Sequence, residues 1–190
     1  MDKINVVAGP KGAGKSTVLR IANFRGLYTH ELSHSVKILE ELGFKRDDLN
    51  YNVPWDDSAL RLSYEHCLKN LPRPLFLSGC SRPKEIEFFE KEGIPYRVIS
   101  IDCPTESRYK RVLERERKGE SNISWKDFLI KDKRRLGNIE GFEANDLEGF
   151  EANDLEGLMK LSEYQIVNKG SLKNLIIKVD SMLKSFGYIK

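Results

Sequence analysis

Residues 9–17 read Gly-Pro-Lys-Gly-Ala-Gly-Lys-Ser-Thr, and they fit the pattern G-x-x-x-x-G-K-[ST] at each fixed position. Glycines in this pattern let successive backbone N–H groups turn inward around phosphate oxygens. Lys15 is expected to reach the β- and γ-phosphates of a nucleotide, and the Ser16 hydroxyl is expected to ligate Mg²⁺. The residues predicted to hold the phosphates are Gly9, Lys11, Gly12, Ala13, Gly14, Lys15, Ser16 and Thr17.

The flanks of this loop have the pattern that a phosphate-binding loop requires. Residues 3–8 form a short β-branched run typical of a buried strand, and residues 17–22 have the spacing of an amphipathic helix. The N-terminus of such a helix attracts the same anion. A glycine-rich turn without a ligand is the alternative, and the strand–loop–helix setting disfavours it.

The composition is that of one mixed domain. A chain of 190 residues is long enough for a single core, so we expect one P-loop kinase domain over residues 1–190. The net charge of +3 does not by itself indicate nucleic acid. Cys67, Cys80 and Cys103 lack C-x-x-C spacing and are expected to be reduced thiols. Without a signal-like or membrane-spanning apolar run, the expected location is the cytoplasm.

Strands and helices alternate along the rest of the chain. Further strands are predicted at residues 27–32, 75–77, 96–101 and 164–167. This alternation predicts an α/β fold: a doubly wound, five-stranded parallel sheet of the P-loop kinase type with a helical lid. Ligands bind at the carboxyl ends of the strands in such sheets, so Glu31, Ser78 and Asp102 are expected to lie near the loop.

An arginine-rich helix is predicted from Thr105, as its cap, through Arg117. Arg108, Arg111 and Arg115 are spaced to share one face of that helix. Arginine suits contact with a γ-phosphoryl group because its planar fork donates two parallel hydrogen bonds. A solvated helix with internal Glu–Arg pairs is the alternative, and the setting in a P-loop chain favours phosphate contact.

A second helix is predicted from its Ser124 cap over residues 125–135. It ends in a basic cluster formed by Lys131, Lys133, Arg134 and Arg135, for which phosphate contact and a solvated surface both stay open. The octapeptide Gly-Phe-Glu-Ala-Asn-Asp-Leu-Glu then occurs twice without a break, at 141–148 and 149–156. Two short copies do not make a repeat architecture, so residues 141–156 are expected to be a tolerated acidic insertion.

The chain resembles the nucleoside-monophosphate-kinase group of P-loop kinases, which includes adenylate kinases and dephospho-coenzyme A kinases. The resemblance rests on 9–17, on Ser78-Gly79 followed by a helix with Glu85, and on 104–117, 128–132 and 164–171. It implies ATP and Mg²⁺ as cofactors. It also implies that Arg111 flanks the adenine, that the turn containing Asn168 lies close to it, and that Arg115 and Arg117 reach the phosphates from a lid at about 117–126.

The chain departs from this group on the acceptor side. Relatives commonly carry Asp-Gly-x-Arg after the third strand, whereas residues 78–82 read Ser-Gly-Cys-Ser-Arg. The Asp that supports Mg²⁺ is therefore absent, and the Arg is displaced by one position. Asp102 is the candidate replacement, with a turn or helix-start role as the alternative. Glu31 is expected to accept the acceptor's hydroxyl proton or to bind a base.

These features predict an ATP- and Mg²⁺-dependent phosphotransferase that acts on a nucleotide or nucleotide-like acceptor. Two alternatives stay open. One is a kinase of an unusual acceptor, such as a hydroxymethylated base in DNA, which the basic 105–135 region could bind through its phosphate backbone. The other is a nucleotide-binding regulatory protein with slow ATPase activity, as the missing Asp could indicate. The oligomeric state is left open.

Overall fold

The computed structural model describes residues 3–32, 34, 41, 71–115, 122–137 and 154–190. Its strands are β1 (Ile4–Ala8), β2 (Tyr28–Glu31), β3 (Leu75–Ser78), β4 (Tyr96–Asp102) and β5 (Tyr164–Val167). Its helices are α1 (Lys15–Phe24), α4 (Lys84–Lys91), α5 (Thr105–Glu114), α6 (Trp125–Leu136), α7 (Leu155–Lys160) and α8 (Leu172–Ser185). None of these helices is long and apolar enough to cross a membrane.

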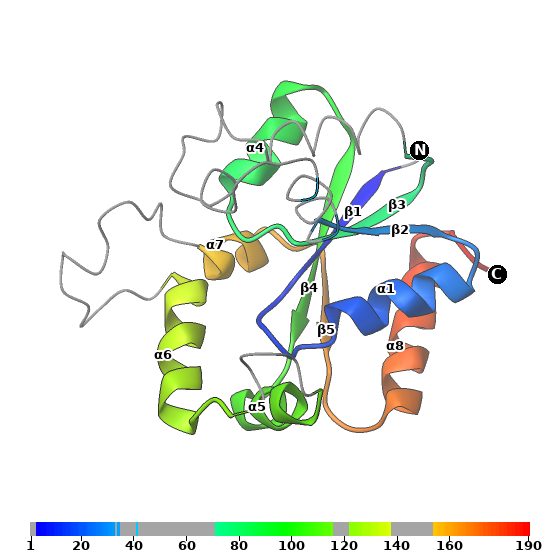
Figure 1. Ribbon diagram of the computed structural model, residues 1–190. Helices are drawn as coiled ribbons and strands as arrows, with labels where there is room; N and C mark the ends of the chain where they lie inside the picture. Colours follow the sequence, from blue (N-terminus) through cyan, green and yellow to red (C-terminus); the bar gives the residue numbers. More distant parts are fainter. Residues whose placement is uncertain (1–2, 33, 35–40, 42–70, 116–121, 138–153) are drawn as a thin grey trace.

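The five strands form one parallel sheet in the order β2-β3-β1-β4-β5 (Figure 1). The P-loop strand β1 is central, and the chain builds β2 and β3 on one side of it before crossing to β4 and β5 on the other. Such crossings leave ligand sites at the carboxyl edge of the sheet. The predicted α/β, doubly wound, five-stranded parallel sheet is confirmed.

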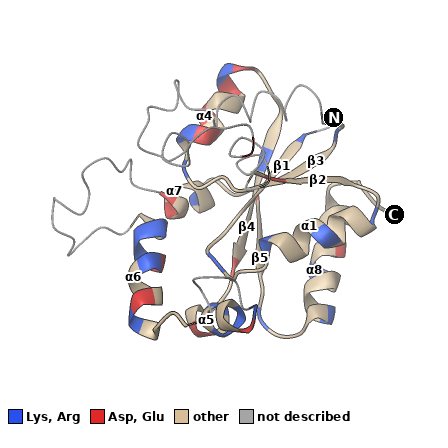
Figure 2. Ribbon diagram, in the orientation of Figure 1, with Lys and Arg blue, Asp and Glu red and all other residues tan. Residues whose placement is uncertain are grey.

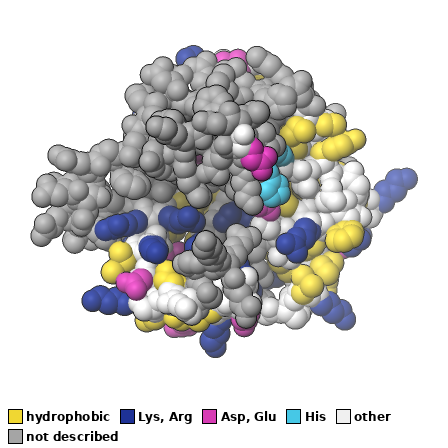
Figure 3. Space-filling model, in the orientation of Figure 1, with side chains coloured by type: hydrophobic (Ala, Val, Ile, Leu, Met, Phe, Trp, Pro, Cys, Tyr) yellow, Lys and Arg dark blue, Asp and Glu magenta, His cyan; other side chains and the backbone are white. Residues whose placement is uncertain are grey.

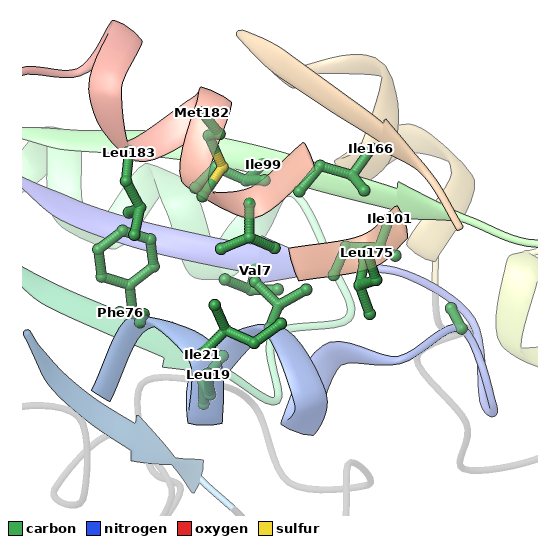
Figure 4. Packing of buried hydrophobic residues seen from close by; sticks show 14 of the residues in the cluster. Val7, Leu19, Ile21, Phe76, Ile99, Ile101, Ile166, Leu175, Met182 and Leu183 are labelled. Atoms are coloured by element: carbon green, nitrogen blue, oxygen red, sulfur yellow. The ribbon is translucent and has the colours of Figure 1, made fainter. Parts of the chain in front are cut away.

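Two apolar clusters cover the two faces of the sheet. On one face α1 and α8 pack against the strands, with Val18, Val179 and Met182 fully buried (Figure 4). On the other face α4 and α7 pack through Phe89 and Leu158. Because both faces are covered, the central strands β1 and β3 are apolar at almost every position, which explains why they read as continuous runs in the sequence.

The strand register aligns the carboxyl ends that the sequence predicted to meet. Ser78 of β3 pairs with Val7 of β1 on one side and with Glu31 of β2 on the other. On the opposite side of β1, Ala8 pairs with Ser100, two residues before the end of β4. The P-loop therefore begins at the middle of a row of strand ends that includes Glu31 and Asp102.

Helix α5 differs from its prediction at both ends. Its cap is Pro104, and Thr105 is the first helical residue. The Thr105 side chain makes no capping hydrogen bond, because Thr105 lies one position past the cap. Its hydroxyl accepts a hydrogen bond from the Arg108 guanidinium, 3.0 Å away. The helix ends at Glu114 and not at Arg117, so Arg115 is its C-cap. Arg117 and the first half of the predicted lid at 117–126 lie outside the described residues. The described second half, 122–126, leads into α6, which begins at Trp125.

The end of the acidic tandem repeat belongs to the folded core. Asp154 caps α7, since its Oδ1 accepts the N–H of Gly157 at 2.7 Å, and Leu155 is buried beside Leu158. The predicted insertion at 141–156 therefore includes two residues that the fold uses, Asp154 and Leu155. An apolar side chain and a capping carboxylate have these roles whatever their origin. The rest of the repeat lies outside the described residues.

Candidate nucleotide-binding site

The loop between β1 and α1 folds around the ammonium group of its own lysine. Lys15 is the first residue of α1, and its Nζ donates hydrogen bonds to the carbonyls of Gly9 at 2.6 Å and Pro10 at 3.1 Å. The N–H of Ala13 closes the loop by bonding to Pro10, 3.1 Å away. The lysine is thereby held across the loop, at the positive end of α1, where it can exchange carbonyl oxygens for phosphate oxygens.

Three consecutive carbonyls of the loop are bound by side chains from distant elements. The Lys11 carbonyl accepts from Arg108 at 3.4 Å, and the Gly12 carbonyl accepts from Arg111 at 3.3 Å. The Ala13 carbonyl accepts from the Asn168 amide at 2.7 Å. In a trans peptide the following N–H points the opposite way, so these bonds orient the loop's amides away from α5 and β5. That orientation is what an anion-binding nest needs.

The loop glycines are required by their neighbours as well as by the loop's own conformation. A Cβ on Gly9 would lie 2.5 Å from the Ile101 carbonyl, and a Cβ on Gly12 would lie 2.7 Å from the Arg108 carbonyl. Both clashes are with backbone, which cannot move aside as a flexible side chain can. The loop is therefore packed directly against β4 and α5.

Arg108 is the buried link between the loop, α5 and α6. Its guanidinium pairs with both carboxylate oxygens of Asp132, and its Nε donates to the Cys103 carbonyl at 3.0 Å. Both side chains are almost fully buried. A bidentate pair of this kind fixes geometry and neutralises both charges. Arg108 therefore positions the loop and α6 by its contacts, whereas the sequence predicted that it shares a phosphate-facing side with Arg111 and Arg115.

Positive charge surrounds Lys15 and changes its proton affinity. Desolvation is the largest cause that lowers the Lys15 pKa from 10.5 to about 8, followed by the charges of Arg135 and Arg115. Glu31 acts in the opposite direction, and Arg108 lowers the pKa further. Because Coulomb effects of this kind fall off with distance, Arg135, Arg115 and Glu31 all lie within electrostatic range of the lysine.

The basic cluster of α6 turns its last residues toward the same region. Lys131, Lys133, Arg134 and Arg135 are exposed on its final turns. Figure 2 shows these cations along α6, and Figure 3 shows Lys and Arg side chains gathered near its carboxyl end. Cations at a helix C-terminus are stabilised by the helix dipole. The sequence left open whether Arg135 contacts phosphate or solvent. The docking of α6 through Asp132 brings Arg135 near Lys15.

Two oxygen donors suit the Mg²⁺ that the P-loop pattern implies. Ser16 lies in the first turn of α1, and Asp102 is the exposed last residue of β4, the strand next to β1. Among the described residues, no three His, Cys, Asp or Glu side chains are grouped as a metal cage. Mg²⁺ at phosphates does not need one, because phosphate oxygens and water supply most of its ligands. The residues present fit such an ion.

The loop after β3 is built around a buried carboxylate. Oε2 of Glu85, in the first turn of α4, accepts the N–H groups of Ser81 at 2.6 Å and Arg82 at 3.2 Å. Its Oε1 lies 3.7 Å from Nη2 of Arg82, and both side chains are buried. Gly79 turns this loop with φ of +121°, where a Cβ would lie 2.7 Å from Cβ of Leu32. The sequence singled out Glu85 only through a resemblance and did not predict this clamp.

Two UPF0200 proteins are similar to this chain in sequence. No protein-family model matches the chain. A UPF0200 protein of Methanothermobacter thermautotrophicus is 26% identical, over 87% of this chain and 81% of that protein. A UPF0200 protein of Pyrobaculum aerophilum is 27% identical, over 72% of this chain and 79% of that protein.

Several solved structures similar to this chain are small-molecule kinases by title. Shikimate kinase from Bacteroides thetaiotaomicron has a TM-score of 0.62 at 10% identity, covering 97% of this chain and 99% of its own. Shikimate kinase from Acinetobacter baumannii, in complex with shikimate, has a TM-score of 0.58 at 19% identity. The match covers 98% of this chain and 94% of that kinase. A gluconokinase from Sinorhizobium meliloti 1021 has a TM-score of 0.55 at 14% identity. The match covers 97% of this chain and 93% of that kinase.

This chain has the P-loop kinase fold. The resemblance to P-loop kinases that the sequence carried is thereby confirmed at the level of the fold. Within the P-loop kinase fold, residues 9–17 lie where the pattern requires, with 9–14 between β1 and α1 and 15–17 in the first turn of α1.

Proposed function

We propose that the protein is a phosphotransferase that moves the γ-phosphoryl group of ATP to a nucleotide-like small molecule, with Mg²⁺. The observation that carries the proposal is the convergence of cations on the loop. Lys15 lies inside it, Arg111 contacts its Gly12 carbonyl, and Arg115 and Arg135 act on the Lys15 pKa. Such a concentration of positive charge matches the charge that spreads over phosphoryl oxygens in the transition state.

Each residue has a role in this proposal. Lys15 and the loop amides hold the β- and γ-phosphates, while Arg115 and Arg135 stabilise the transferred group. Arg111 and Asn168 flank the adenine side of the loop, in the manner that the resemblance implies. Mg²⁺, when bound at Ser16 and Asp102, supplies charge neutralisation between the phosphates. Arg117 and a lid at 117–126 remain part of the proposal by resemblance alone.

The proposed transfer forms one bond to the γ-phosphorus and breaks one. An acceptor oxygen forms a bond to the γ-phosphorus as the bond from that phosphorus to the bridging oxygen breaks, and ADP leaves. If the acceptor oxygen is a hydroxyl, its proton passes to Glu31, which ends β2 beside Ser78. The kinases of similar fold act on shikimate, gluconate and sugars by title, which supports a small hydroxylated acceptor.

The decisive experiment follows labelled γ-phosphate from ATP into products, with a panel of mononucleotides, dephospho-coenzyme A, shikimate and gluconate. Lys15→Ala is expected to abolish transfer with the fold intact, whereas Lys91→Ala, an exposed lysine on α4, is expected to keep it. Wild-type transfer by Lys15→Ala would show that the loop has another role. Label found only in free phosphate would indicate the nucleotide-binding regulatory alternative. Transfer that requires DNA and falls steeply with salt would indicate the nucleic-acid alternative.

A further inference from the structure

Cys103, the first residue after β4, contacts both arginines that hold the P-loop. Its carbonyl accepts a hydrogen bond from Nε of Arg108 at 3.0 Å, and its sulfur accepts one from Nη1 of Arg111 at 3.3 Å. The two guanidinium groups in turn donate to the Lys11 and Gly12 carbonyls of the loop. Cys103 is only 2% exposed. This one residue therefore links the end of β4 to two of the side chains that orient the loop.

The two arginines differ in what surrounds their charges, although they are only three residues apart on α5. Arg108 is buried against the carboxylate of Asp132, which neutralises its charge and fixes its position. Arg111 is partly exposed, and within the described part of the chain its hydrogen bonds go to the Gly12 carbonyl and the Cys103 sulfur. Arg111 is therefore held at the loop without a carboxylate partner among the described residues.

The sulfur that binds Arg111 is a neutral acceptor. Burial raises the pKa of the Cys103 thiol, and this effect exceeds the opposite effect of the Arg111 and Arg108 charges. A neutral thiol sulfur accepts hydrogen bonds only weakly, so it orients a guanidinium without competing strongly with a phosphate for it. A carboxylate at position 103 would instead neutralise Arg111, as Asp132 neutralises Arg108.

We infer that Cys103 is a positioning residue, which holds the Arg111 side chain beside the P-loop and releases it to the nucleotide. This inference rests on the proposed function, because the nucleotide is the anion that Arg111 would meet there. An arginine side chain has many rotamers, and the cost of ordering it on binding weakens affinity. Because the sulfur already orders Arg111 in the free protein, less of that cost remains when the nucleotide binds.

The experiment measures the affinity of the full chain for a non-hydrolysable ATP analogue with Mg²⁺, by calorimetry. Cys103→Ala removes the acceptor and should weaken binding about fivefold, which corresponds to the loss of one neutral hydrogen bond. Cys103→Ser keeps a small neutral acceptor and should bind within about twofold of the wild type. The matched control is Cys80→Ala, which changes a buried free cysteine in the loop after β3 and should leave this affinity unchanged.

The Arg111→Met variant separates positioning from a purely structural role of Cys103. If Cys103 acts through Arg111, Cys103→Ala should cause no further loss of affinity in the Arg111→Met background. A second measurement needs no variant that alters Cys103. In ¹⁵N spectra of the wild type, the guanidinium resonance of Arg111 should shift when the ATP analogue binds, and that of Arg108 should shift less because Asp132 fixes it.

Three results would overturn the inference. They are an affinity of Cys103→Ala equal to that of the wild type, a loss on Cys103→Ala that persists without Arg111 or is not rescued by Cys103→Ser, and an Arg111 resonance that stays in place when the analogue binds. The last of these is read in the wild type, so it is decisive even if a variant does not fold. Failure of the wild type to bind the analogue would count against the proposed function itself, so the two failures are distinguishable.

Discussion

The two loops at the carboxyl edge of the sheet are held in opposite ways. The P-loop is bound by side chains 97, 99 and 155 residues away, namely Arg108, Arg111 and Asn168. The loop after β3 is bound by Glu85, three and four residues away from the N–H groups it accepts. The first loop is therefore a product of tertiary structure, and the second is largely local.

This difference indicates how each end of the proposed reaction is controlled. The P-loop depends on the docking of α5, α6 and β5, so substitutions far from it should alter nucleotide binding. The β3 loop depends on one carboxyl group with a pKa near neutrality, so pH should affect it more than distant substitutions do. Substitutions at the two loops should therefore differ both in the size of their effects and in their pH dependence.

The largest effect is expected from breaking the buried Arg108–Asp132 pair. Asp132→Ala should lower the free energy of unfolding by about 3–5 kcal/mol, because it leaves a buried guanidinium without its carboxylate. It should also weaken nucleotide binding, since Arg108 contacts the Lys11 carbonyl. Denaturant unfolding and nucleotide titration measure both.

The matched control is the exposed pair between Lys160 and Glu156, whose charged groups are 3.1 Å apart. Glu156→Gln should change stability by only about 0.5 kcal/mol or less. If Asp132→Ala and Glu156→Gln lowered the free energy of unfolding equally, the role assigned to Arg108 would be contradicted.

A smaller effect is expected at Gly12, which has almost the same φ as Gly26, +80° against +82°. A Cβ on Gly12 would lie 2.7 Å from a backbone carbonyl, whereas a Cβ on Gly26 would have no atom within 4 Å. Gly26→Ala should lower the free energy of unfolding by about 1 kcal/mol, because alanine is strained in the left-handed conformation. Gly12→Ala should lower it by about 2–3 kcal/mol and should also weaken nucleotide binding. Thermal unfolding of both variants, compared at one pH, tests whether the contact with α5 is a real constraint.

Lys15 should reduce the stability of the folded state while it enables binding. Its pKa is lowered from 10.5 to about 8, so the folded state binds fewer protons than the unfolded state between those values, and stability should rise with pH across that window. Lys15→Met should stabilise the protein at pH 7 by about 1–2 kcal/mol and abolish nucleotide binding. Lys91→Met should do neither. Destabilisation by Lys15→Met would mean that its bonds to Gly9 and Pro10 outweigh the cost of its charge.

The smallest effect on stability is expected at Glu85. Its raised pKa means that the folded state binds more protons than the unfolded state between pH 4.5 and 7, so this group lowers stability as the pH rises through that window. Glu85→Gln should remove that loss and be about 1 kcal/mol more stable than the wild type at pH 8. Parallel stability–pH curves for the two proteins would show that Glu85 does not titrate in this range.

Local patterns were enough to predict most elements of the sheet. The runs at 96–101 and 164–167 match β4 and β5 to within one residue, because β-branched and aromatic side chains recur along both strands. The Ser124 cap is confirmed, since its hydroxyl accepts the N–H of Asp127, three residues later. Thr105 is not the cap, because the helix begins one residue earlier than predicted: Pro104 is its N-cap and Thr105 is its first helical residue.

The candidate site shows the same division between local and distant causes. Lys15 and Ser16 follow from a pattern of nine residues, whose chemistry is contained in the loop and the helix after it. Arg135 could not be assigned, because its approach to Lys15 depends on the docking of α6 through Asp132. The Glu85 clamp could have been predicted from the sequence, since a carboxylate in the first turn of a helix commonly accepts N–H groups just before it.

The sequence by itself determined that this chain has a phosphate-binding loop between a strand and a helix, on a parallel α/β sheet. Those features depend on side-chain size, backbone freedom and periodicity, which are properties of neighbouring residues. Only the tertiary structure decided which cations surround the loop and which residues hold its carbonyls. Arg108, Arg111, Asn168 and Arg135 acquire those roles because packing of the helices on the sheet brings together groups about 100 or more residues apart.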